Sequence, residues 1–209
     1  ARYLSYIYRV NKARNAKYGE LGLMQIPSAG AASERPCLPA STGIEGDNPA
    51  GAACLMDVFA VVGEAEALPQ FVQLSNIRQI DAFRYGSAFS RGACVVEPGL
   101  IQIHISGTAA VNEQGESLSP GDAQAQTVWT LDAIEALIAQ QGATLQDVCQ
   151  ATIFLKRASD YAVCRDVMAE RELTEMPAVC VRADVCREEL LFELDGVAAP
   201  CPAEETDDR

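Results

Sequence analysis

The stretch from Leu100 to Val111, "LIQIHISGTAAV", constrains the fold more than any other part of the chain. Ile101, Ile103 and Ile105 alternate with polar residues, which is the period-two pattern of a strand with one buried face. The apolar run "FSRGACVV" and the turn "EPG" precede it, so the two runs together predict a β-hairpin. The chain therefore contains a sheet that must bury one of its faces.

Helical and strand patterns alternate after this hairpin. An apolar stripe predicts a helix from Asp122 to Gln141, formed by Val128, Leu131, Ile134, Leu137 and Ile138. "VCQATIFLK" predicts a strand, and a helix follows from the cap at 158–160 to about residue 172. "PAVCVRADVC" and "LLFELDGVAA" predict a second hairpin around the turn "REE". The order is ββαβαββ, which indicates an α+β fold with helices packed on one face of the sheet.

The N-terminal third predicts a partial copy of the same unit. Apolar residues at helical spacing predict a helix from Tyr3 to about Leu23, and "LPASTGIEG" and "ACLMDVFAVVG" predict strands joined by a turn over 46–51. Helix, Pro-Ala strand, turn and strand recur in this order within residues 160–198. We therefore expect a partial half-domain over 1–68, a linker over 69–83, a complete domain carrying the active site over 84–199 and a tail over 200–209.

Composition excludes several classes of function. Twenty-nine acidic against sixteen basic residues give a net charge of −13, so no basic stripe is available for a nucleic-acid partner. No apolar run reaches the length of a membrane span. Eight cysteines without a C-x-x-C motif, and a single histidine, predict reduced and buried thiols in a cytoplasmic protein, with no metal site. An anionic ligand must therefore be bound by a few local arginines.

The second block resembles a known family. Its ββαβαββ order, with "ISGTAAV", the helix-and-strand stretch from "GDAQAQ" to "RASDYA", and "MPA", is similar to the YjgF/RidA superfamily, which includes endoribonuclease L-PSP-like proteins. The resemblance implies a chorismate-mutase-like fold and a homotrimer with ligand clefts between subunits. In the deaminase branch an arginine after Pro-Ala binds the substrate carboxylate. Val179 stands there in this chain, which counts against a standard deaminase.

Two further stretches, "NIRQIDAFRYGSAFSRG" and "VRADVCREELLFELDG", resemble the chorismatase branch of this superfamily. Its members cleave the enolpyruvyl ether of chorismate and release pyruvate without a cofactor. The resemblance implies that Glu193 is the catalytic acid. It also implies that Cys186, seven residues upstream, marks the subtype that forms 3-hydroxybenzoate. The stretch around "YGSAF" is shorter than in that branch, and the first half-domain is incomplete.

The chemistry gives independent reasons to single out these two residues. Cleaving an enol ether requires protonation of carbon, so the acid must stay protonated near neutral pH, as a carboxyl in an apolar setting does. Glu193 stands between Phe192 and Leu194, although strand alternation alone favours a solvent-facing side chain. Cys186 precedes Arg187, and a nearby guanidinium lowers a thiol pKa. The alternative for Cys186 is an inert core thiol.

A dianion such as chorismate needs two cationic partners. Arg182 and Arg91 are the candidates for bidentate contacts, with Arg84 and Arg187 as runners-up. Tyr85, Gly107 and Thr108 complete the predicted substrate-binding set, Tyr85 as a hydrogen-bond donor and Gly107 as a point of close ligand approach. Each residue also has a purely structural interpretation, as a surface charge, a half-buried aromatic or a tight strand exit. An imine deaminase and a non-catalytic trimeric ligand-binding protein stay open as alternatives.

Overall fold

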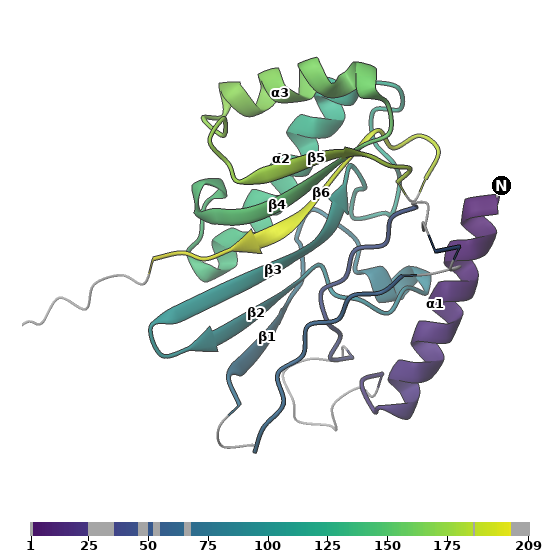
Figure 1. The fold of residues 1–209 in the computed structure, drawn as a ribbon, viewed down its shortest axis with the longest axis vertical. Coiled ribbons are helices and arrows are strands. Elements are labelled where there is room, and N and C mark those ends of the chain that lie inside the picture. Colours follow the sequence, from purple (N-terminus) through teal and green to yellow (C-terminus); the bar gives the residue numbers. More distant parts are fainter. Residues whose placement is uncertain are drawn as a thin grey trace, which may run out of the picture.

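The computed structural model describes residues 2–24, 36–45, 50–51, 55–64, 68–185 and 187–201. These residues form a six-stranded sheet with the spatial order β1-β2-β3-β6-β4-β5 (Figure 1). The strands are β1 (Gln70–Leu74), β2 (Gly92–Glu97), β3 (Leu100–Ala109), β4 (Val148–Leu155), β5 (Ala178–Arg182) and β6 (Phe192–Ala198). The helices are α1 (Arg2–Glu20), α2 (Ala123–Ile138) and α3 (Tyr161–Glu170). Short 3-10 turns cover Ala82–Tyr85, Ala139–Gln141, Leu145–Asp147 and Ala158–Asp160.

The order β2-β3-α2-β4-α3-β5-β6 confirms the predicted α+β fold. Helices α2 and α3 lie together on one face of the sheet, and α1 is set apart from them (Figure 1). The main hydrophobic core fills the space between α2, α3 and the sheet, and it includes Ile103, Ile105, Leu131, Ile134, Leu137, Phe192 and Leu194. The alternating isoleucines of β3 predicted one buried face, and this is the face that packs against α2.

Helix α2 begins and ends as its sequence predicts. The Asp122 carboxylate accepts a hydrogen bond from the backbone N–H of Ala125 at 2.9 Å, which is the geometry of an N-cap. Gly142 has a φ of 73°, in the left-handed region that favours glycine, and it ends the last turn. These local signals need no tertiary context, which explains why the prediction succeeds.

The predicted hairpin between the last two strands is wrong. Strand β6 inserts between β3 and β4 and is antiparallel to both, whereas β5 pairs only with β4, in parallel. The helix α3 carries the chain from β4 back to the start of β5, and a helical crossover of this kind produces a parallel neighbour. A strand–turn–strand pattern in the sequence does not predict this arrangement. The same turn residues can connect two strands that pair with each other or two strands that pair with different neighbours.

The N-terminal third agrees with the prediction only in its helix. Residues 36–45 are extended, with single bridges from Ala40 to Ser90 and from Glu45 to Asp184, and residues 55–62 form no strand. The predicted hairpin over 38–63 is therefore wrong, because the first of its segments hydrogen-bonds to the main sheet instead. Most of its turn, 46–49, and residues 52–54 lie outside the described residues. The predicted linker over 69–83 contains β1, which pairs with β2 at the sheet edge.

The sequence predicts buried thiols and no membrane-spanning helix, and the structure agrees with the first prediction only in part. Among the described cysteines, Cys94 and Cys164 are buried as predicted, but the other four are exposed: Cys37, Cys149, Cys180 and Cys201. The error arises because β5 is an edge strand and Cys149 lies at an irregularity between β4 and β6. None of the helices in the described ranges combines the length and the apolar character needed to cross a bilayer.

Gly196 gives a test of the β4–β6 contact. A Cβ atom at this position would overlap the carbonyl oxygen of Gln150 and lie 3.2 Å from the Cα of Ala151. We expect Gly196→Ala to lower the free energy of unfolding by about 2 kcal/mol or more, because backbone must move to admit the methyl group. The matched control is Gly19→Ala in α1, where a Cβ meets no atom within 4 Å. Equal stability of the two variants in urea denaturation would contradict this packing.

Candidate active site

Glu193 lies on the face of the sheet opposite to α2. Its neighbours Phe192 and Leu194 both belong to the core that packs against the helices, so the alternation of β6 turns Glu193 the other way. In the sheet it pairs with Ala109 of β3 and Phe154 of β4. The side chain is nevertheless buried, with 4 % of the residue exposed. The expected burial is present, but the helices do not provide it.

The cover over this face comes from the extended segment 36–45. The backbone N–H of Gly107 donates to Thr42 Oγ1 at 3.0 Å, and the N–H of Ser41 donates to Ser106 Oγ at 3.0 Å. The N–H of Ser90 donates to the carbonyl of Pro39 at 2.9 Å. The segment crosses β3 where the β3–β6 register shifts, between residues 105 and 108. It therefore shields the Glu193 carboxyl from water.

Gly107 allows the carboxyl and the cover to meet. A Cβ at this position would overlap Oε1 of Glu193 and lie 2.9 Å from Cγ2 of Thr42. A side chain of any size would therefore displace the carboxyl, the threonine or both. The sequence predicted close approach of a ligand at Gly107, and the structure shows that the approaching group is the carboxyl of the same chain.

Burial sets the protonation state of Glu193. Desolvation is the largest cause that raises its pKa to about 8, the negative charge of Asp195 raises it further, and the positive charge of Arg91 lowers it. A carboxyl with this pKa is mainly neutral at pH 7. Glu193 is therefore a proton donor at the pH where an ordinary surface glutamate is a base.

Arg91 is a buried cation beside this acid. Its Nε and Nη2 donate to the carbonyl of Ile80 at 2.9 and 2.7 Å, and Nη2 also donates to Tyr85 Oη at 2.9 Å. The guanidinium lies over the rings of Tyr85 and Phe89, 5.7 and 5.5 Å from their centroids. Among the described residues no carboxylate forms a salt bridge with Arg91. A buried guanidinium without an acidic partner is suited to bind an anion.

The other predicted residues do not all converge on Glu193. Tyr85 does, through its hydrogen bond to Arg91. Thr108 pairs with Leu194, so it points toward the helices, and its hydroxyl donates to the carbonyl of Ser106 at 2.8 Å. Arg182 pairs with Leu155, which places it on the helix side of the edge strand β5, exposed to solvent.

Of the remaining three predicted residues, the structure describes two. Arg84 is exposed. Arg187 donates from Nη1 to the carbonyl of Gly115 at 2.7 Å, which anchors the turn before β6. Cys186 lies outside the described residues.

The sequence reasoning missed the contribution of Ser41 and Thr42. Both stand in "LPASTG", which was interpreted as a strand of a separate half-domain rather than as a cover for the second. The available signal was the Pro-Ala start that this segment shares with "MPAVC", since it marks the two stretches as related elements. That similarity does not show which surface the first stretch contacts.

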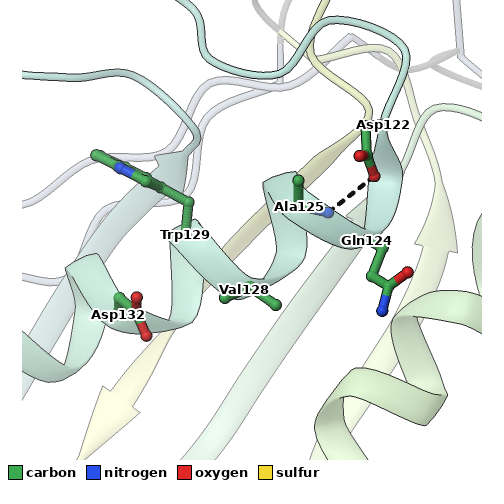
Figure 2. A pocket seen from close by; sticks show the side chains of 6 residues that line it. All are labelled: Asp122, Gln124, Ala125, Val128, Trp129 and Asp132. Carbon is green, nitrogen blue, oxygen red and sulfur yellow. Dashed lines mark hydrogen bonds between the residues drawn. The ribbon is translucent and has the colours of Figure 1, made fainter.

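A separate hollow lies on the exposed side of α2. Asp122, Gln124, Ala125, Val128, Trp129 and Asp132 line it, and Figure 2 shows the Trp129 side chain standing off the helix above Val128. Asp132 is held by salt bridges to Arg171 and Arg78. Glu193 and Arg91 do not line this hollow. Within the described part of the chain, no cluster of three metal-ligating side chains occurs here or elsewhere.

The fold is that of a small α+β domain of the L-PSP type. The family model described as Endoribonuclease L-PSP matches residues 87–200, which is more than half of the chain. The chain belongs to this family. This confirms the broad resemblance drawn from the ββαβαββ pattern.

The relatives and structural neighbours include proteins named for two different activities. The 3-aminoacrylate deaminase RutC of Acinetobacter baylyi is 33% identical over 97 residues, which are 46% of this chain and 77% of RutC. A solved chorismatase structure superposes with a TM-score of 0.55 and 23% identity, over 62% of this chain and 44% of that chain. The yeast protein YEO7 superposes with a TM-score of 0.53 and 18% identity, over 62% and 98% of the two chains. At these identities the structural matches show the fold alone, and this chain spans less than half of the chorismatase.

The raised pKa of Glu193 predicts a pH-dependent stability. The unfolded chain has an ordinary glutamate pKa of about 4.3, so the fold loses about 1.4 kcal/mol per pH unit as pH rises from there to about 8. We expect Glu193→Gln, which stays neutral, to be more stable than the wild type at pH 9 and to lose this advantage at pH 4. The control is Glu97→Gln at an exposed strand end. Parallel stability–pH curves for wild type and Glu193→Gln would show that the carboxyl is hydrated.

Proposed function

We propose that this protein cleaves the enolpyruvyl ether of chorismate to pyruvate and 3-hydroxybenzoate, with Glu193 as the general acid. The observation that carries the proposal is the buried, neutral carboxyl of Glu193 beside a buried guanidinium that has no acidic partner in the described residues. The first group supplies a proton at neutral pH, and the second binds a carboxylate.

The reaction begins with proton transfer to carbon. The carboxyl of Glu193 protonates the methylene carbon of the enol ether, the electrons of the C=C bond form the new C–H bond, and positive charge develops on the ether carbon and oxygen. The resulting glutamate anion lies next to this cation and stabilises it. Arg91 binds the neighbouring carboxylate and orients the double bond toward the acid. Cleavage of the ether bond to the ring then completes pyruvate.

The atoms of chorismate that do not leave as pyruvate form the aromatic product. Chorismate has the same atoms as pyruvate plus 3-hydroxybenzoate, so the overall reaction needs no oxidant, reductant or cofactor. Internal transfer of oxygen on the ring and loss of a ring proton give the aromatic product. The sequence resemblance assigns the choice of this product to Cys186, and the same resemblance supports chorismate as the substrate.

An imine or enamine deaminase is the second candidate, and the similarity to RutC favours it. Deamination of an enamine also begins with protonation of carbon, so Glu193 would serve both reactions. The difference lies in the carboxylate contact. Val179 is 64 % exposed on β5, where the deaminase branch has an arginine, and a valine cannot bind a carboxylate. This substitution leads us to prefer the ether-cleaving reaction.

Pyruvate release tests the first proposal. With chorismate as substrate, we expect wild-type protein to produce pyruvate in a lactate-dehydrogenase-coupled assay, and Glu193→Gln to lose about 10²-fold or more in kcat. Glu97→Gln, the matched carboxyl-to-amide change at an exposed position, should keep full activity. Intact chorismate in the presence of wild-type protein, together with ammonia release from an amino-acid-derived imine, would establish the deaminase instead.

The pH profile tests the role of the neutral form. Activity should fall as pH rises through about 8, because Glu193 then loses the proton that it must donate. Removing the negative charge of Asp195 removes one cause of the raised pKa, so Asp195→Asn should move this alkaline limb to lower pH. A limb that does not move, or that moves upward, would contradict the assignment of Glu193 as the titrating group.

A further inference from the structure

Helix α1 docks on the loop that leads to Arg91 through one polar face. Asn11 and Asn15, one turn apart, make the contacts: Nδ2 of Asn11 donates to Ser87 Oγ at 3.0 Å, and Nδ2 of Asn15 donates to the carbonyl of Gly86 at 2.9 Å. Oδ1 of Asn15 also accepts from the N–H of Ala88 at 3.2 Å. These bonds fix α1 against residues 86–88.

The third residue of that face, Arg14, reaches past the docking loop. Its Nη1 donates to Ser41 Oγ at 3.1 Å, and Nη2 donates to Oδ1 of Asn11 at 2.8 Å. Its guanidinium lies 5.5 Å from the centroid of the Phe89 ring. Arg91 lies at the same distance from the same ring. Two guanidinium groups from distant parts of the chain thus meet at one aromatic side chain.

Arg14 is connected by hydrogen bonds to the segment that covers Glu193. Its partner Ser41 is bonded to Ser106 and is followed by Thr42, which contacts Gly107 beside the Glu193 carboxyl. Arg14 is half-buried, so part of its surface is accessible. An anion that contacts both guanidinium groups is attracted by both charges. The protein has a net charge of −13, so two neighbouring guanidinium groups form a local region of positive charge. Such a region favours the binding of an anionic ligand.

We propose that Arg14 is a specificity-determining residue that binds the second carboxylate of a dianionic substrate, while Arg91 binds the first. In this proposal α1 contributes a substrate-binding side chain to the site. The two guanidinium groups both contact the ring of Phe89, which links them in one cluster. The choice of reaction rests on the function proposed above, but dicarboxylate binding is tested without turnover.

The test compares two inert aromatic probes by isothermal titration calorimetry at low salt. Isophthalate carries two carboxylates and benzoate carries one. We expect Arg14→Gln to weaken isophthalate binding roughly tenfold or more and to leave benzoate binding within about twofold, because only the second carboxylate loses its partner. The control Lys12→Gln removes the same charge from an exposed position of the same helix and should affect neither probe.

A conservative variant separates binding from docking. Arg14→Lys keeps the charge and should retain most of the preference for isophthalate over benzoate. Equal weakening of both probes in Arg14→Gln would mean that the residue only supports the fold, and it would overturn the proposal. Absence of saturable isophthalate binding to the wild type would overturn it as well. If the wild type prefers isophthalate over benzoate but does not cleave chorismate, the proposed reaction is refuted. The assignment of Arg14 as a carboxylate-binding residue is then still supported.

Discussion

The structure of the site depends on one contact, the packing of an extended N-terminal segment over the carboxyl of Glu193. Thr42 meets the carboxyl at Gly107, where only a glycine leaves room for both. This contact removes water from an acid that would otherwise be ionised, and desolvation is the largest cause of its raised pKa. The proposed protonation chemistry depends on this burial.

The cover makes the N-terminal third part of the active unit. It does not form the separate half-domain hairpin that its sequence suggested, and its hydrogen bonds go to β3 and to the loop before β2. The bridge from Glu45 to Asp184 extends the contact to the segment between β5 and β6. Residues 36–45 therefore belong to the same packed unit as the L-PSP domain.

The two proposed reactions share their first chemical step. Ether cleavage and enamine deamination both begin with a proton transfer to carbon, for which we propose the neutral carboxyl of Glu193. What separates the two reactions is how carboxylates are held. Val179 offers no cationic group on β5, whereas Arg91, just before β2, places one near Glu193 on the same face of the sheet.

Local sequence patterns determined the helices and strands from β2 to β6, and tertiary packing decided their neighbours. The isoleucine alternation, the Asp122 cap and the stop at Gly142 act within a few residues, so they predicted the β2–β3 hairpin and α2 from sequence alone. Alternation alone favoured a solvent-facing Glu193, and only the tertiary structure shows that this side chain is buried. The position of β6 between β3 and β4, the exposure of Arg182 and the cover by Thr42 depend on contacts between residues far apart in the chain. Hydrophobic periodicity does not predict such contacts. It indicates which face of a helix or strand is buried, but not which other element covers that face.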